Sequence, residues 1–270
     1  MSEKLKVGAV VYAPKVTVIW KIIGDFFEKE GFPIELVFYK DYPMQVDGLM
    51  SGEIDVAWNS PLAWVDTYLR TEGKALDGHM RDTDVDRDTY LVVRKDSGIK
   101  SPEELKGKTI GFGAIDSPQA RIIPIYALSK NGLEYEKDYI EKRFDLLVGL
   151  QGDHIGGELD SLKALVAGEV DATWMLDLNY EAWVTDGTLD PNQLEVIFKT
   201  PKFDHCIFSG RPDLCPDKFK KFGEILDKMD YNNPDHKEMM DMEGLKKWVP
   251  GRTTGFEQLK NACEYIGFFK

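Results

Sequence analysis

The sequence is poor in cysteine and contains no long apolar run. Only three of its 270 residues are cysteines, Cys206, Cys215 and Cys263, which is too few for a disulfide framework. We expect free thiols, and a Cys206–Cys215 disulfide stays open as the alternative. No stretch approaches the roughly 18 consecutive apolar residues that a membrane span requires. The chain must therefore fold around an ordinary core, for which its 43% of hydrophobic residues is sufficient.

An excess of positive charge is also absent. The chain carries 34 Lys and Arg against 47 Asp and Glu, a formal net charge of −13. Nucleic-acid binding requires basic residues that replace the counterions of the phosphates, so this charge balance excludes a nucleic-acid partner. It disfavours an acidic membrane surface for the same reason. An anionic ligand would need a local device, and the N-terminus of a helix is the usual one.

The spacings typical of metal sites and of common enzymes are missing. There is no CxxC or HExxH, and the four histidines are scattered. There is no GxSxG elbow and no Walker A motif. Cys206 adjoins His205, but neighbours on a strand point to opposite faces, which disfavours a nucleophile–base pair. We therefore expect no catalytic residue, no metal and no cofactor.

The first residues show no secretory signal. Residues 1–6 lead directly into an apolar run, without a hydrophobic leader core or a lipobox cysteine. Two interpretations stay open. The protein is cytoplasmic as written, or it is periplasmic or extracellular and a leader has been removed.

Short apolar runs alternate with amphipathic segments along the chain. Such alternation predicts an α/β fold with mostly parallel sheets and right-handed crossovers. Ser-Pro pairs at 60–61, 101–102 and 117–118 combine an N-cap with a proline in the first turn, which predicts that helices begin there. The expected strands cover 6–12, 34–39, 54–58, 89–94, 109–112, 170–175 and 194–199; further helices are expected at 16–30, 44–50, 160–166, 216–229, 238–248 and 255–268.

The extended runs at 89–94 and 194–199 indicate two lobes between which the chain crosses twice. We expect residues 1–88 with 195–270 to form the first lobe, because the C-terminal helices would pack back on it. Residues 89–194 would form the second lobe, and the ligand cleft would lie between the two. Ligands of open α/β sheets bind at the carboxyl ends of the strands.

With these elements placed, the sequence resembles the type 2 periplasmic binding proteins, and among them the phosphate-, phosphite- and phosphonate-binding components of ABC transporters. The resemblance spans nearly the whole chain in the expected order. It implies two lobes, a two-strand hinge and closure around a small ligand, with a permease as partner and no oligomer. The motifs that carry it are Asp41-Tyr42, GEIDVAWNSPLA at 52–63, VVRKDSGI at 92–99, ELKGK at 104–108, GAIDSPQA at 113–120, GDH at 152–154, AGEVDA at 167–172 and GRPDL at 210–214.

In the second lobe, the principal candidates for ligand contact are Ser117, Gln119 and Ala120. Ser117 would cap the helix, and the free N–H groups after Pro118 would face an anion. Phosphonate binders have a hydroxyl-rich loop here, and its replacement by Pro, Gln and Ala makes a carboxylate or an amide-bearing ligand an alternative. The resemblance adds His154 as a partner for an oxyanion and Asp177, walled by Trp174, as a partner for an amine.

In the first lobe, Asn59 and Ser60 follow a strand and form the matching helix start. Tyr42 matches a position where the resembling family often carries a ligand-touching tyrosine. Tyr12 and Lys15 are expected at the same sheet edge. Arg81 is a candidate for bidentate anion contact, with an interlobe salt bridge as the alternative.

These observations predict a solute-binding protein that closes on a small anionic or zwitterionic molecule, such as a phosphonate-like oxyanion or a carboxylate. An ABC-transport role fits best. A cytoplasmic enzyme on the same fold, as in menaquinone or thiamin-pyrimidine biosynthesis, and a ligand sensor stay open as alternatives. In the enzyme, His154 or Asp177 would serve as acid or base.

Overall fold

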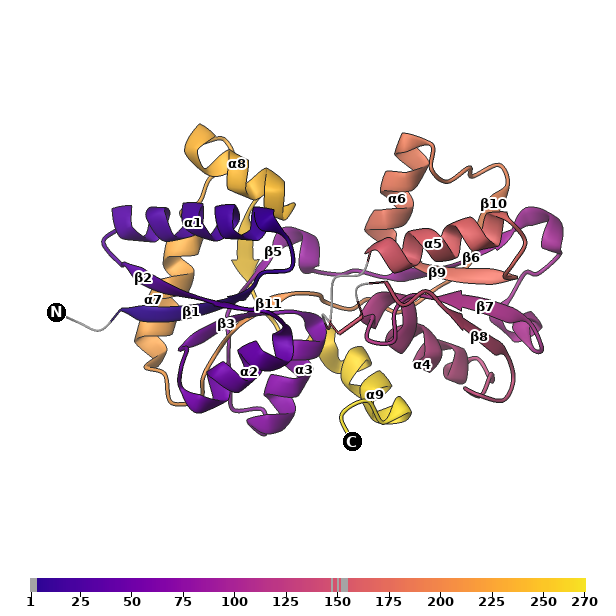
Figure 1. The fold of residues 1–270 in the computed structure, drawn as a ribbon, viewed down its shortest axis with the longest axis horizontal. Coiled ribbons are helices and arrows are strands. Elements are labelled where there is room, and N and C mark those ends of the chain that lie inside the picture. The colour runs from indigo at the N-terminus through magenta and orange to yellow at the C-terminus, as the bar shows by residue number, and fades with distance from the viewer. Residues whose placement is uncertain (1–3, 147, 150, 152–154) are drawn as a thin grey trace. The chain divides into compact units, whose positions relative to one another are not determined.

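The computed structural model describes residues 4–146, 148, 149, 151 and 155–270. The chain divides into two compact units (Figure 1). The first consists of Met1–Val85 and Asp204–Phe256, and the second of Asp86–Phe203 and Glu257–Lys270. The chain therefore passes from one unit to the other three times.

The first unit contains a five-stranded mixed sheet in the order β2-β1-β3-β11-β4. β1, β2 and β3 run parallel, whereas β11 pairs antiparallel with β3 and with β4. A second, two-stranded sheet pairs β5 with β12. The strands are β1 (Leu5–Val10), β2 (Ile34–Tyr39), β3 (Val56–Asn59), β4 (Leu76–Asp77), β5 (His79–Arg81), β11 (Ile207–Gly210) and β12 (Trp248–Pro250).

Helices cover both faces of this sheet (Figure 1). Leu5, Val7 and Ala9 of β1 lie in a core with apolar residues of α1, α7 and α8, while Val10 lies in a second core with residues of α2 and α3. This alternation along β1 is the period of two that a strand imposes. The helices are α1 (Pro14–Lys29), α2 (Tyr42–Ser51), α3 (Pro61–Arg70), α7 (Pro216–Leu226) and α8 (Pro234–Glu243).

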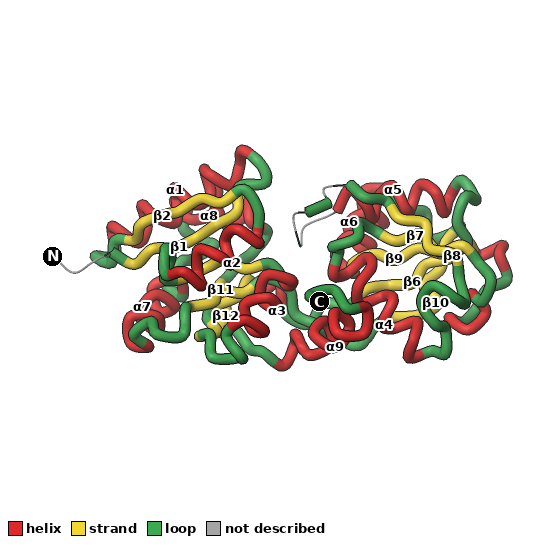
Figure 2. The backbone as a smooth tube through the Cα atoms, turned by 60° about the horizontal axis from the view of Figure 1, so that its bottom comes forward, coloured by secondary structure: helices red, strands yellow, loops and turns green. Residues whose placement is uncertain are grey.

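The second unit contains a five-stranded sheet in the order β10-β6-β9-β7-β8. β7 runs parallel to β8 and β9, and β6 is antiparallel to β9 and β10. α4 and α9 cover one face, and α5 and α6 cover the other (Figure 2). The elements are β6 (Thr89–Arg94), β7 (Thr109–Phe112), β8 (Ile140–Arg143), β9 (Ala172–Leu176), β10 (Leu194–Lys199), α4 (Ile123–Lys130), α5 (Ile155–Val166), α6 (Asp177–Asp186) and α9 (Glu257–Ile266).

Three expectations about local structure were wrong. The expected helix from residue 101 is a single 3-10 turn, Pro102–Leu105. The expected helix at 238–248 ends at Glu243, because Gly244 adopts the left-handed conformation (φ 74°) and Trp248 joins β12. The last helix, α9, belongs to the second unit and packs against α4, whereas we had placed residues 195–270 entirely in the first. Sequence periodicity shows that a helix has an apolar face but not which sheet receives it.

The three cysteines are free. Cys206 and Cys263 are buried and Cys215 is exposed, so the alternative of a Cys206–Cys215 disulfide is not realised. Burial raises the pKa of the Cys263 thiol to about 12. Among the described residues, no helix is long and apolar enough to cross a membrane.

Candidate functional site

The carboxyl ends of the parallel strands carry most of the predicted ligand residues. In the first unit β1, β2 and β3 end at one edge, where Tyr12 and Tyr42 follow β1 and β2 and Asn59 is the last residue of β3. In the second unit β7 and β9 end together, and Ser117 and Asp177 follow. Each unit thus gathers its candidates at the edge where open α/β sheets bind ligands.

The segment after β7 forms a compact helix start. Ser117 is fully buried, and its Oγ accepts a hydrogen bond from the backbone N–H of Ala120 (3.2 Å). Gly113 lets this turn lie close to the strand, because a Cβ added there would be 2.7 Å from the Cβ of Ala120. The first turn, Pro118–Ile122, is π-helical and continues into α4. Such π-helical turns are rare in proteins, and those that occur often lie at functional sites.

A buried carboxylate that we did not predict ties this edge together. Glu158, in the first turn of α5, is fully buried. Its Oε1 accepts from Gln119 Nε2 (3.0 Å), and its Oε2 accepts from the backbone N–H of Leu176 (2.8 Å) and from Asn179 Nδ2 (2.9 Å). Glu158 therefore links the helix start after β7, the end of β9 and α6. An acidic residue directly after two glycines was the available signal in the sequence.

Asp177 begins α6 at the end of β9. Its side chain is buried and pairs with Arg87 (3.3 Å), while its Oδ1 has no hydrogen-bond partner among the described residues. Burial raises the pKa of Asp177, and Arg87 only partly opposes this effect. Trp174, which we expected to wall the ligand, lies in the core with Phe198, because its position on β9 points into the sheet–helix interface. In this structure Trp174 is a core residue that supports the edge.

In the first unit the side chain of Asn59 is occupied by structural contacts. Its Oδ1 accepts from Gln45 Nε2 (3.1 Å), and its Nδ2 donates to Thr67 Oγ1 (3.2 Å). Gln45 also donates to the carbonyl of Trp58 (2.9 Å). Asn59 thus joins β3 to α2 and α3. Ser60 caps α3 as predicted, accepting from the backbone N–H of Ala63 (3.2 Å).

The other candidates of this edge are divided between core and surface. Tyr42 is buried in the core beside Tyr39 and Val46, so it is a packing residue in this conformation. The side chain of Tyr12 is 36% exposed. Lys15 is exposed at the start of α1, and its Nζ donates to the carbonyl of Met242 (3.1 Å).

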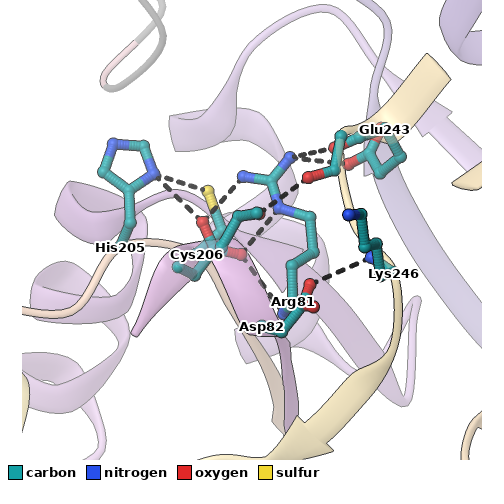
Figure 3. Close-up of polar contacts among 9 residues, drawn as sticks. Arg81, Asp82, His205, Cys206, Glu243 and Lys246 are labelled. Carbon is teal, nitrogen blue, oxygen red and sulfur yellow. Dashed lines mark hydrogen bonds and ion pairs between the residues drawn. The ribbon is translucent and has the colours of Figure 1, made fainter. Parts of the chain in front are cut away.

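Arg81 is not free for an anion. Its Nε and Nη2 bind the two carboxylate oxygens of Asp84 (2.6 and 2.8 Å), and its Nη1 binds both the side chain and the carbonyl of Glu243 (3.1 Å each) (Figure 3). All three residues belong to the first unit, so the alternative of an interlobe salt bridge is also wrong. Sequence alone shows the Asp three residues later but not Glu243, which is distant in the chain.

His205 and Cys206 adjoin this ion-pair cluster. His205 Nδ1 lies 3.5 Å from Asp84 Oδ1 and 3.2 Å from Cys206 Sγ (Figure 3). The donor atoms of Asp84, His205 and Cys206 come within 4.8 Å of one another, which is a spacing that could hold a metal ion. Arg81 engages both oxygens of Asp84 and places a positive charge beside them, so the residues fit a buried ion pair better than a cation.

Burial raises the pKa of Asp84, but Arg81 and His205 outweigh burial and hold it well below its usual range. Asp84 is therefore ionised. His154, the remaining candidate, lies outside the described residues.

The profile of the family "ABC transporter, phosphonate, periplasmic substrate-binding protein" matches residues 11–254. The chain belongs to this family. Its members are substrate-binding proteins of transporters, so the chain is a solute-binding protein and not an enzyme, as predicted. Family membership favours this function over the alternative of a biosynthetic enzyme.

Individual relatives agree with this assignment. The chain is 25% identical over 235 residues to "Probable ABC transporter phosphite binding protein PhnD1" of Prochlorococcus marinus (strain MIT 9301), covering 82% of this chain and 74% of that one. The structure of that protein with methylphosphonate superposes with a TM-score of 0.69 at 19% identity and covers 97% of this chain and 98% of the other. XAC2383 of Xanthomonas citri, bound to ATP, gives a TM-score of 0.72 at 15% identity, covering 99% and 98%. These structures confirm the two-lobed α/β binding-protein fold.

Proposed function

We propose that this solute-binding protein captures a small tetrahedral oxyanion of the phosphonate, phosphite or phosphate class and delivers it to an ABC permease. The observation that carries the ligand class is the helix start at Ser117 and Pro118. It directs backbone N–H groups and the positive end of a helix dipole to the carboxyl edge of the second sheet. In a chain with a net charge of −13, such a local device is what an anion requires.

The residues that we propose for ligand contact are a subset of the predicted ones. Ser117, Gln119 and the N–H of Ala120 supply the second unit, with Asp177 as a partner for any amine on the ligand. Tyr12, Lys15 and Ser60 supply the first. Asn59 and Arg81 act behind the surface, because other side chains occupy their polar atoms.

The partners and the location follow from the family. We propose that the protein works in the periplasm, where the family is described as acting, and that an ABC permease receives the ligand. We further propose that it works as a monomer, as we expected from the sequence.

Isothermal titration calorimetry with a defined panel tests this proposal. The panel contains methylphosphonate, phosphite, phosphate, 2-aminoethylphosphonate, methanesulfonate and acetate. We expect a phosphorus oxyanion to bind at least tenfold more tightly than acetate, a difference of about 1.4 kcal/mol. Tighter binding of the aminophosphonate than of methylphosphonate would support contact between Asp177 and an amine.

The variant Asp177→Asn tests the proposed contact between Asp177 and an amine of the ligand. It should weaken 2-aminoethylphosphonate and leave methylphosphonate within about twofold, because only the former carries a positive charge. Absence of binding by every phosphorus oxyanion would contradict the proposed ligand class.

A further inference from the structure

We propose that Gln119 selects a protonated oxyanion, one that carries a P–OH group in addition to its charged oxygens. This inference rests on the proposed function and sharpens it, since it specifies which ionic form of the ligand is bound. The structural basis is the fixed orientation of one buried amide.

Glu158 determines which way the Gln119 amide faces. Both carboxylate oxygens of Glu158 accept hydrogen bonds, Oε1 from the Gln119 amide nitrogen and Oε2 from the backbone N–H of Leu176 and from Asn179. The Nε2 atom of Gln119 must therefore face Glu158. If the amide turned over and placed Nε2 where Oε1 now lies, the hydrogen bond to Glu158 would be lost.

The other polar atoms of Gln119 have no hydrogen-bond partner among the described residues. Gln119 is 2% exposed, and its Oε1 is buried without a hydrogen bond among the described residues. A buried acceptor without a partner costs free energy, which makes it a candidate for a ligand contact. No acceptor for its backbone N–H is found in the described part of the chain either.

The Oε1 atom and the backbone N–H of Gln119 together complement a protonated oxyanion. A charged oxygen accepts from the backbone N–H at the helix start, and a P–OH donates to Oε1. A dianion would instead place a second charged oxygen against an acceptor, which is repulsive. A sulfonate is disfavoured to a lesser degree, because it keeps a single charge but has no proton to donate at neutral pH.

The other ionisable groups that the structure describes at this edge do not offer an alternative donor to Gln119. Asp116, after β7, accepts from the backbone N–H groups of Gly149 (2.7 Å) and Gln151 (2.9 Å). Asp177 pairs with Arg87, and Arg121 pairs with Glu141 (2.6 Å). Asp116, Glu158 and Asp177 are all acidic, so their presence further opposes a second negative charge on the ligand.

Calorimetry of the wild-type chain from pH 5.5 to 8.5 tests the inference. Methylphosphonate should bind as the monoanion, so above its second pKa its apparent Kd should rise about tenfold per pH unit. Methanesulfonate keeps one charge and no proton throughout, so its own profile records any titration of the protein. The inference predicts a steep profile for methylphosphonate relative to methanesulfonate, and parallel profiles would overturn it.

Two variants attribute the effect to Gln119. Glu158→Gln allows the Gln119 amide to turn and present its NH2 group, which should reduce the methylphosphonate slope to under about twofold per pH unit. Gln119→Met removes the acceptor and should weaken binding at pH 5.5 by roughly tenfold. Ser161→Ala, on the same helix α5 but bonded to Thr173, is the control and should keep the wild-type slope.

The outcomes separate the two proposals. Binding of methylphosphonate that does not weaken above its second pKa would refute the selection of a protonated ligand and leave the proposed function intact. Absence of binding by any phosphorus oxyanion at every pH would refute both. An unchanged slope in Glu158→Gln would show that Gln119 is not the selecting group.

Discussion

The candidate ligand residues of the two units differ in how their polar atoms are hydrogen-bonded. In the first, the amide of Asn59 and the guanidinium of Arg81 bind other residues of that unit. In the second, the Oε1 of Gln119 and the Oδ1 of Asp177 are buried without a hydrogen bond from any described residue. Two buried aspartates differ in the same sense, since the pKa of Asp84 is lowered and that of Asp177 is raised.

This difference distinguishes residues that stabilise the fold from residues that recognise a ligand. A satisfied buried network stabilises a single arrangement of its elements. Groups left without partners destabilise the free protein and become favourable when a ligand completes them. We therefore infer that the first unit supplies a rigid surface and that the second holds the groups that distinguish one ligand from another.

The largest expected effect comes from breaking the network of the first unit. Arg81→Met leaves the Asp84 carboxylate buried without the guanidinium group that binds both its oxygens. It also removes the ion pair of Glu243. Removal of one partner from a buried ion pair costs about 3–5 kcal/mol, and urea denaturation should show a loss of this size. The matched control is Arg70→Met, whose exposed pair with Asp47 should contribute no more than about 1 kcal/mol.

The fall of the unfolding free energy at acid pH provides a check on the same cluster. Because the pKa of Asp84 is lowered in the folded state, its contribution is present above its unfolded pKa of about 3.9 and is lost as the pH falls further. In Arg81→Met the unfolding free energy should fall less steeply below pH 4. A wild-type slope in the variant would contradict the role that we assign to the pair.

The two N-cap serines offer a matched pair of intermediate size. Ser60→Ala and Ser117→Ala each remove one side-chain acceptor at a helix start and should cost about 1 kcal/mol in denaturant unfolding. Ser117→Ala should in addition weaken oxyanion binding in calorimetry more than Ser60→Ala does. Equal effects of the two variants on affinity would remove the distinction between the units.

The smallest expected effect is a gain in stability. The raised pKa of Asp177 means that its ionised form is disfavoured by folding, a penalty present at neutral pH and absent below the unfolded pKa of about 3.9. Asp177→Asn should therefore raise the unfolding free energy at pH 7, within about 1 kcal/mol, and leave it unchanged near pH 3.

Asp160→Asn, at the exposed pair with Lys163, is the control for Asp177→Asn and should change little at either pH. A loss of stability in Asp177→Asn at pH 7 would show that its pairing with Arg87 outweighs the burial of its charge.

Local signals predicted much of this structure. The starts of α3 and of the helical segment after β7 depend on a Ser-Pro pair, and both formed as expected. The strand–helix alternation was sufficient to predict an α/β fold with two sheets. Gly52 and Gly168 lie just after helices α2 and α5, and both adopt positive φ.

The roles of side chains depended on distant residues and could not be predicted. Asn59 lies at the carboxyl end of its strand, but Gln45 and Thr67 decide where its amide points. The orientation of Gln119 depends on Glu158, 39 residues later. Trp174 alternates with its neighbours along β9, and only the packing of Phe198 shows that its side lies in the core.

The third passage of the chain between the units affects how the protein can be made. Residues 204–256 complete the first unit, and residues 257–270 complete the second. As the polypeptide leaves the ribosome from its N-terminus, neither unit has all its parts until these late segments emerge. Neither unit can therefore fold completely from a single continuous stretch of the chain, in contrast to the domain-by-domain folding that is common in larger proteins.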